Sequence, residues 1–208
     1  KGRSLTNLVN HGFHVPTGFH VTTNAYKQFV ANNDLQAQIL AAAKPTLVNG
    51  QASFERASSQ IQGMFDEASV SSELHAEIVA AYAGFTQTEP AVAVRSSANA
   101  EDLPDLSFAG QQETYLNIRG SDEVVEAVKR CWASLWTAQA LNYRHQNGIA
   151  QDSVAMSVVV QLLIPADVAG ILFTANPATG ERSEMVVNAS YGLGEAVVSG
   201  QITPDTFI

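Results

Sequence analysis

The chain has 208 residues, of which 46% are hydrophobic and 15% are charged, so it can bury a core and is too apolar to be mainly disordered. Its 11 Lys and Arg against 20 Asp and Glu give a formal charge of -9, which argues against nonspecific binding to nucleic acid or to an anionic membrane. The single cysteine excludes a disulfide framework within the chain. The sequence has no apolar run of the ~18 residues that span a membrane and no signal peptide, so we expect a cytoplasmic protein.

The first 29 residues are rich in Gly, His and Thr. Apolar residues occupy alternate positions over 13–15 and over 19–21, which predicts a short strand on either side of the Pro16-Thr17-Gly18 turn. The Thr-Thr-Asn sequence at 22–24 then supplies N-cap candidates for a helix over 25–30.

Residues 34–85 are dominated by Ala, Gln, Glu and Ser. Their apolar residues recur three and four positions apart, which is the period of an amphipathic helix. We predict three helices in this stretch, interrupted near 45–50 and near 68–72. Nothing in the stretch indicates chemistry.

From Ala91 onward, extended runs alternate with a helical one. Strands are predicted over 91–95, 114–118, 154–161, 169–173 and 185–188. One long helix is predicted to begin at Ser121, ahead of two acids, and to end at Asn147-Gly148. Its apolar stripe, which we interpret as core, consists of Val124, Val128, Cys131, Trp132, Leu135 and Trp136. The mixture of elements predicts an α+β or α/β fold.

The densest polar segment follows the predicted strand over 91–95. Arg95 ends that strand, Ser96 and Ser97 follow, and the loop beyond holds three acids and the run Ser-Phe-Ala-Gly-Gln at 107–111. A guanidinium fork, hydroxyls and backbone N–H groups are suited to phosphate oxygens. The segment is either a phosphate site or a structural turn in which Arg95 forms an ion pair with an acid of the same loop.

Two other segments leave a binding role and a structural role open. The strand over 154–161 ends at Gln161 and the chain breaks at Pro165, which suits an adenine-binding hinge or an ordinary strand end. Gly192-Leu193-Gly194 is either a loop that approaches a ligand or a turn before a helix. The sequence contains no P-loop and no Gly-x-Gly-x-x-Gly motif, and its five His do not cluster at metal-ligand spacing.

The signature of one known family is similar to residues 94–111, VRSSANAEDLPDLSFAGQ. This is the N-terminal ATP-binding domain shared by phosphoenolpyruvate synthase, pyruvate phosphate dikinase and rifampin phosphotransferase. Three further segments resemble the family in the same order: Lys1-Gly2 with Val15-Pro16-x-Gly18-Phe19, then Gly170-Ile171-Leu172-Phe173-Thr174-x-Asn176-Pro177, then Ala189-Ser190-Tyr191-Gly192-Leu193-Gly194-Glu195. The resemblance spans essentially the whole chain and is weakest over 34–85.

This resemblance implies an ATP-grasp-type α+β (α/β) fold, with a helical N-terminal stretch and a mixed β-sheet with flanking helices. Enzymes of the family use ATP and Mg²⁺ and move a phosphoryl group from ATP to a His on a separate swivelling domain. An acceptor-binding domain of the same polypeptide then passes the group to pyruvate or to the antibiotic. The resemblance implies no nucleic-acid partner and no membrane partner.

The resemblance also implies roles for individual residues. Lys1 and Arg95 would be the catalytic cations that bind the phosphates, Gly110 would lie under the phosphates, and the segment from Gln161 to Ile164 would hold adenine. The implied nucleotide site as a whole is Lys1, Arg95, Ser96, Ser107, Gly110, Gln111, Thr114, Gln161, Leu163 and Ile164.

Part of the family's site has no counterpart in this sequence. The second ATP-grasp element, with the metal ligands, would lie beyond residue 208, and none of the five His lies in the family's phosphohistidine motif. We therefore expect a truncated piece, inactive alone, with an N-terminal subdomain over 1–90 and a part over 91–208 that carries the phosphate loop and the adenine hinge. The alternatives left open are rifampin as the acceptor and a nucleotide-binding module that does not catalyse.

Overall fold

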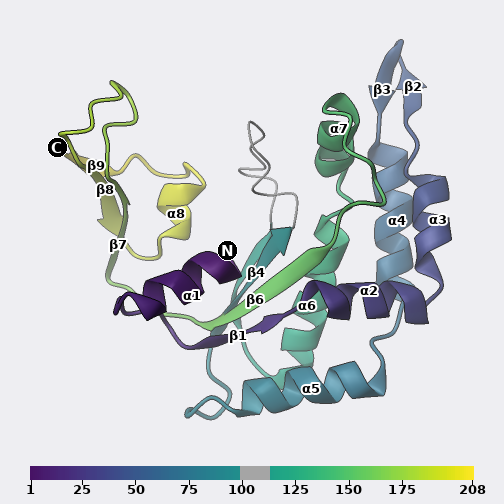
Figure 1. The fold of residues 1–208 in the computed structure, drawn as a ribbon, viewed down its shortest axis with the longest axis horizontal. Helices are drawn as coiled ribbons and strands as arrows, with labels where there is room; N and C mark the ends of the chain where they lie inside the picture. The colour runs from purple at the N-terminus through teal and green to yellow at the C-terminus, as the bar shows by residue number, and fades with distance from the viewer. Residues whose placement is uncertain (99–112) are drawn as a thin grey trace. The chain divides into compact units, whose positions relative to one another are not determined.

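A computed structural model describes residues 1–98 and 113–208 of the chain (Figure 1). The described residues form two compact units, Lys1–Leu163 and Ile164–Ile208. The boundary predicted near residue 90 does not coincide with this division, because β1 (Gly18–Val21) and β4 (Val92–Ala98) both pair with β6 (Met156–Leu162) in one sheet. Each unit is described below by itself.

The first unit is built on a sheet with the strand order β1-β6-β4-β5, where β5 is Thr114–Ile118. All strand pairs within the described residues of this sheet are antiparallel. A hairpin of β2 (Thr46–Val48) and β3 (Gln51–Ser53) stands apart from it. Together with the helices, this arrangement confirms the α+β prediction.

The helices of the first unit follow the predicted pattern over residues 34–85 and differ from it elsewhere. The three helices predicted there correspond to α3, α4 and α5. The helix bounds are α1 Gly2–Asn10, α2 Thr23–Asn32, α3 Leu35–Ala42, α4 Glu55–Glu67, α5 Ser72–Ala83, α6 Ser121–Ser134 and α7 Ala138–Gln146. Among the residues that the structure describes, no helix has the length and apolar character needed to cross a membrane.

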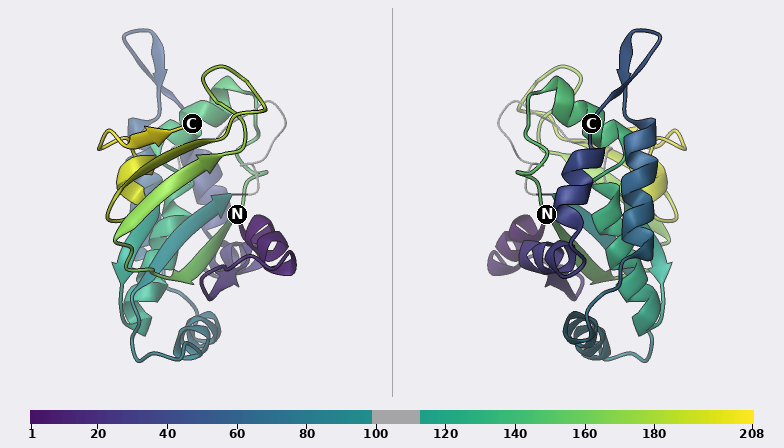
Figure 2. Two further views of the ribbon diagram at one scale, coloured as in Figure 1. Left: turned by 90° about the vertical axis from the view of Figure 1, so that its left-hand side faces the viewer. Right: turned by 90° about the vertical axis from the view of Figure 1, so that its right-hand side faces the viewer.

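The hydrophobic core lies between α6 and one face of the sheet, with α2, α4 and α5 completing it (Figure 2). Trp132 of α6 packs against the rings of Phe29 and Tyr26, at centroid distances of 5.0 and 6.3 Å. The indole nitrogen of Trp136 donates a hydrogen bond to the Tyr26 hydroxyl at 3.0 Å. Every residue of the predicted apolar stripe is buried, so the interpretation of the two tryptophans as core is confirmed.

Two predictions about secondary structure were wrong. The long helix predicted from Ser121 to Asn147 ends at Ser134, and α7 starts anew with the Thr137 hydroxyl accepting from the Ala140 N–H at 3.2 Å. The strand predicted before the Pro16 turn is absent from the described residues 11–17. The neighbouring strand β6 ends at Leu162, whose N–H donates to Thr17, so residues before Thr17 have no strand to pair with.

The second unit is a sheet of β7 (Val168–Phe173), β8 (Val186–Tyr191) and β9 (Asp205–Phe207), with the short helix α8 (Glu195–Val198). Asn176 organises the loop between β7 and β8, because its side-chain oxygen accepts from two backbone N–H groups and its amide donates to Glu184 at 2.7 Å. Gly192 has φ = 84°, a left-handed conformation that favours glycine. The Gly192-Leu193-Gly194 segment is a turn before α8, and its role in approaching a ligand stays a prediction.

Candidate functional site

The two faces of the β1-β6-β4-β5 sheet are distinct because successive strand residues point to opposite sides. We call one the α6 face, marked by the buried Val92, Val94, Val158 and Val160. We call the other the α1 face; it carries Arg95, Ser97, Val159 and Gln161, and the cavity between α1 and the sheet opens onto it. The candidate site lies on the α1 face.

Arg95 and Thr114 lie side by side on the α1 face. Arg95 pairs with Thr114 on β5 and with Val159 on β6, and Val159 pairs in turn with His20 on β1. Directly paired residues of an antiparallel sheet share a face, with Cβ atoms roughly 4.5–5.5 Å apart. Arg95 and Thr114, both part of the nucleotide site that the family resemblance implies, are therefore neighbours. In the sequence, residues 96–113 lie between them.

Lys1 joins this group through its backbone. The amino group of Lys1, the first residue of this chain, donates a hydrogen bond to the Ser97 hydroxyl at 3.1 Å. Ser97 lies two residues after Arg95 on the same strand, so both side chains are on the α1 face. The structure thus brings the start of α1 to the part of β4 that carries Arg95.

Ser96 lies on the other face. It is 1% exposed, and its hydroxyl donates to the backbone oxygen of Glu113 at 3.0 Å. The structure therefore does not bring Ser96 to Arg95, and the adjacent Ser97 takes the place that we had given to Ser96. Sequence reasoning missed Ser97, although the two-residue period of a strand that contains Arg95 could have indicated it.

The three residues predicted to hold adenine are placed differently from one another. Gln161 is buried on the α1 face, and its side-chain amide donates to the backbone oxygen of Pro16 at 3.0 Å. The N–H of Leu163 donates to the backbone oxygen of Ala91 at 2.9 Å. Ile164 is exposed and belongs to the second unit. The adenine role of this segment stays a prediction.

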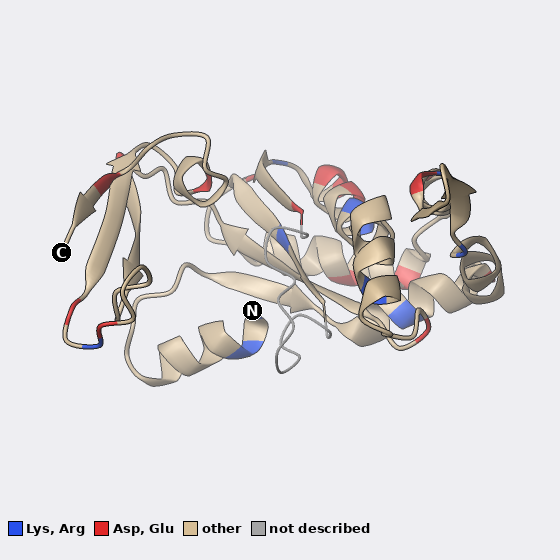
Figure 3. Ribbon diagram, turned by 90° about the horizontal axis from the view of Figure 1, so that it is seen from above, with Lys and Arg blue, Asp and Glu red and all other residues tan. Residues whose placement is uncertain are grey.

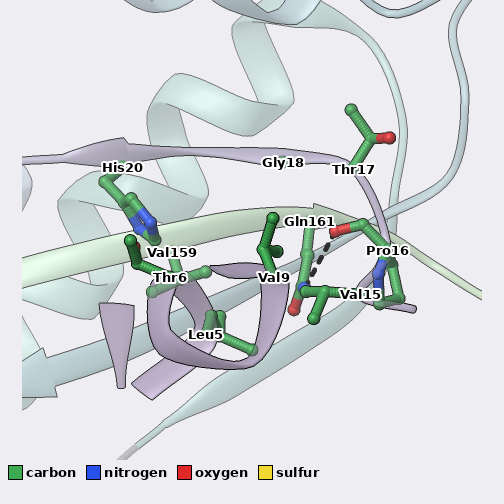
Figure 4. Close-up of a pocket in the computed structure, with 10 residues that line it drawn as sticks. All are labelled: Leu5, Thr6, Val9, Val15, Pro16, Thr17, Gly18, His20, Val159 and Gln161. Carbon is green, nitrogen blue, oxygen red and sulfur yellow. Dashed lines mark hydrogen bonds between the residues drawn. The ribbon is translucent and has the colours of Figure 1, made fainter. Parts of the chain in front are cut away.

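A cavity of about 380 Å³ lies between α1 and the α1 face (Figure 4). Leu5, Thr6 and Val9 of α1 line it from one side, and Val159 and Gln161 of β6 line it from the other. At the end of the cavity, Gly18 pairs with Gln161. A Cβ atom on Gly18 would lie 2.4 Å from the Val160 backbone oxygen, so only glycine allows this close approach.

The local charge on this side of the sheet differs from the charge of the chain. Residues 1–22, which comprise α1, the loop after it and β1, contain Lys1 and Arg3 and no acid, although the whole chain has a formal charge of -9. The basic colour at the start of α1 in Figure 3 corresponds to this segment. With Arg95 on the facing strand, the α1 face is suited to an anionic ligand.

Part of the predicted site lies outside the described residues, namely Ser107, Gly110 and Gln111. Within residues 1–98 and 113–208, no group of three or more His, Cys, Asp or Glu residues could hold a metal ion. The Mg²⁺ that the family resemblance implies therefore has no ligand set among these residues.

Cys131 lies beneath β4 in α6, and its thiol is a core group. Burial raises its pKa to about 12; Glu113 raises it further, and Arg130 and Lys1 act in the opposite direction. A thiol that stays protonated at neutral pH is a poor nucleophile. Apart from the imidazole of His20, the described polar groups of the site are therefore cations, hydroxyls and amides.

The chain is similar to known proteins along its whole length. Residues 1–208 match the family model described as pyruvate phosphate dikinase, AMP/ATP-binding domain. All of the chain aligns with phosphoenolpyruvate synthase of Pyrococcus furiosus at 42% identity and with that of Aeropyrum pernix at 44% identity. It aligns at 43% identity with a probable phosphoenolpyruvate synthase of Methanocaldococcus jannaschii. The chain spans 30%, 26% and 18% of the lengths of these relatives.

Proposed function

The chain belongs to the family of pyruvate phosphate dikinase AMP/ATP-binding domains, and from this premise we propose that it is the ATP-binding part of a phosphoenolpyruvate-synthase-like phosphotransferase. In the proposed reaction, a phosphoryl group moves from ATP to a His on a separate swivelling domain. An acceptor-binding domain of the same polypeptide then delivers it to pyruvate. The observation that carries the proposal is the arrangement of Arg95, Thr114 and the start of α1 on one face of the sheet.

Each of these groups has a role that follows from its chemistry. The Arg95 guanidinium offers a planar set of donors that matches phosphate oxygens, and Lys1 adds a second positive charge. Fixed cations stabilise the charge on a transferring phosphoryl group without reorganising during the reaction. The Thr114 hydroxyl, beside Arg95, supplies a neutral donor. Ser107, Gly110 and Gln111 would add donors from the loop.

The α1 face also has the length that a nucleotide needs. Gln161 pairs with Ala93, and Ser97 pairs with Ser157. These two cross-strand pairs are therefore four residues apart along the antiparallel strands β4 and β6. This corresponds to roughly 13 Å along the strand. We propose that the phosphates bind at the Arg95 end and that adenine binds toward Gln161 and Leu163, where the first unit ends.

Mg²⁺ would neutralise phosphate charge when bound, as in other phosphoryl transfers. The described residues of this chain hold no group of three or more His, Cys, Asp or Glu that could bind a metal ion, so we assign Mg²⁺ no ligand and no step. The use of ATP and the single reduced thiol favour the cytoplasm as the compartment.

The proposal is tested with the full-length protein that contains this chain. ATP binding is measured by calorimetry, and pyruvate-dependent formation of phosphoenolpyruvate is measured by phosphorus NMR. Arg95→Ala should weaken ATP binding and lower the rate of phosphoenolpyruvate formation by about 10²–10³-fold, whereas Lys27→Ala, which changes an exposed lysine on α2, should leave both unchanged. ATP consumption without any dependence on pyruvate would indicate another acceptor, such as rifampin. Binding without turnover would indicate a module that does not catalyse.

A further inference from the structure

A second pocket of the first unit lies between α3 and α4. Its volume is about 380 Å³, within the roughly 300–1,000 Å³ that is typical of small-molecule pockets. None of the residues that line it lines the cavity beneath α1. We call it the α3–α4 pocket, and its polar lining residues are Gln38, Lys44, Thr46, Arg56 and Gln60.

The base of the β2–β3 hairpin brings the two cations of this pocket together. Thr46, the first residue of β2, pairs with Ser53, the last residue of β3. Lys44 comes two residues before this pair and Arg56 comes three residues after it, in the first turn of α4. Helix α3 leads into the hairpin and α4 leads out of it, and the two helices lie side by side (Figure 1). The two glutamines therefore line the pocket farther along these helices.

Lys44 and Arg56 have no partner that would neutralise their charges. Both are exposed, and within residues 1–98 and 113–208 neither forms a hydrogen bond or an ion pair. No carboxylate lines the pocket, although the chain has 20 Asp and Glu against 11 Lys and Arg. Glu55 precedes Arg56 but is not a lining residue. Two like charges that line one pocket repel each other, so an anion between them is stabilised.

The lining residues match the two parts of a small phosphate monoester. An arginine offers a planar set of donors to phosphate oxygens, and a lysine adds a point charge. A phosphate monoester carries a charge of about -1.5 to -2 at neutral pH, so it suits two cations better than a single carboxylate does. Gln38 and Gln60 offer hydrogen-bonding groups to an organic part, and three alanines and Met64 offer apolar contact.

We propose that the α3–α4 pocket is a second anion site, which binds a small phosphate monoester with its phosphate between Lys44 and Arg56. The organic part lies toward the glutamines and is limited in size by the pocket. This site does not rest on the function proposed above, because the pocket shares no lining residue with the cavity on the α1 face. Both cations are exposed to water and salt, so we expect a dissociation constant in the millimolar range.

Equilibrium dialysis of the full-length protein against radiolabelled glycerol 3-phosphate tests the site. Lys44→Ala and Arg56→Ala should each raise the dissociation constant by about tenfold, the factor that one hydrogen bond to a charged group is worth. Lys44→Arg keeps the charge and should bind nearly as well as the parent protein. Lys27→Ala is the control, since it removes an exposed charge on α2 outside the pocket. A lack of saturable binding, or equal binding in all four variants, would overturn the proposal.

A carboxylate placed in the pocket provides an independent test. Gln60→Glu keeps the size of the side chain and adds a negative charge to the lining, so it should weaken binding of glycerol 3-phosphate at least as much as the loss of one cation. Gln62→Glu makes the same change on the same helix, but Gln62 does not line the pocket. It should change the dissociation constant by less than about twofold. An equal effect of the two substitutions would show that the probe binds elsewhere.

Hydrogen exchange locates the bound probe within the chain. Saturating glycerol 3-phosphate should slow amide exchange over residues 38–46 and 55–64, because a ligand that binds the folded state suppresses local opening. Exchange over α5 should not change. Slower exchange that is confined to other segments would contradict the assignment to this pocket.

Arg95→Ala separates this site from the proposed ATP site. The variant should bind glycerol 3-phosphate as the parent protein does. If Arg95→Ala abolishes binding of the probe and Lys44→Ala does not, the phosphate lies on the α1 face and the second site is wrong. If Arg95→Ala leaves ATP turnover unchanged while Lys44→Ala weakens binding of the probe, the proposed function is wrong and the second site stands.

Discussion

The α6 face and the α1 face belong to the same strands, but they are covered in different ways. On the α6 face, Val94 and Val160 are fully buried beneath Trp132 and the rest of α6. On the α1 face, Arg95 and Ser97 lie beside a helix without a single buried residue among those the structure describes. From this difference we expect the α6 face to contribute mainly to stability and the α1 face to carry the proposed ATP site, since alternate residues of each strand point to opposite faces.

From this comparison we expect substitutions in β4 and β6 to have different effects on the two faces. Changes that point toward α6 should lower the free energy of unfolding, because they remove buried apolar area. Changes to the polar residues that point toward α1 should alter ATP binding and lower the free energy of unfolding less than changes that point toward α6. The following experiments test this separation, beginning with the largest expected effect.

Trp132→Ala should have the largest effect, on stability. Trp132 is fully buried and contacts Phe29 and Tyr26, so truncation should lower the free energy of unfolding by about 3–5 kcal/mol. Urea denaturation measures this loss. Leu47→Ala is the control, since Leu47 is 79% exposed; a loss of similar size in both variants would contradict the assignment of the core to the α6 face.

Arg95→Ala should have a comparable effect on function and little effect on stability. Loss of one fixed donor to a charged transition state typically lowers kcat by about 10²–10³-fold, or about 2.7–4 kcal/mol. The free energy of unfolding should change by less than about 0.5 kcal/mol, since Arg95 is partly exposed and forms no ion pair within the described residues. Steady-state kinetics and urea denaturation of the same variant separate the two outcomes. Turnover within a few-fold of the parent protein would make Arg95 a structural residue.

Raising the pH should destabilise the protein through the α6 face. Burial raises the pKa of Cys131 from its ordinary value of 9.0 to about 12, so above pH 9 the unfolded chain loses this proton while the folded chain keeps it. The resulting stability is complete below pH 9 and falls by about 1.4 kcal/mol per pH unit up to the folded pKa. Tyr26 and Tyr115, whose pKa values burial also raises to about 12, add to the loss above pH 10.

Urea denaturation of Cys131→Ala between pH 8.5 and 10 checks this expectation. In this pH range the cysteine thiol of the unfolded chain titrates, whereas tyrosines titrate mainly above it. The variant should show a shallower decline of unfolding free energy with pH than the parent protein. An identical slope in the two proteins would show that the thiol does not contribute.

The adjacent serines give the smallest effect and the closest control. Ser96→Ala should lower the free energy of unfolding by about 0.5–1 kcal/mol, since the Glu113 oxygen that loses the hydroxyl keeps a bond from the Ser96 N–H at 3.2 Å. It should leave the KM for ATP unchanged. Ser97→Ala should show the reverse pattern. If both variants change the KM, the two faces are not functionally separate.

Much of this architecture could be predicted from residue patterns. The strand over 114–118, the three helices within 34–85 and the apolar stripe of α6 follow from local periodicity, which burial then preserves. The motif around Arg95 was sufficient to indicate the family, because a long run of specific residues does not depend on packing.

Other features depended on contacts that no local pattern contains. The lack of a strand before Thr17 followed from where β6 ends. Which face of the sheet carries Arg95 and Ser97 was settled by the side of β4 that α6 covers. Likewise, the Gln161 amide meets Pro16 across 145 residues of sequence. The sequence by itself thus determined which segments are helical or extended and to which family they belong. Only the tertiary structure decided which side chains meet on the α1 face, because strand pairing joins residues that are remote in the chain.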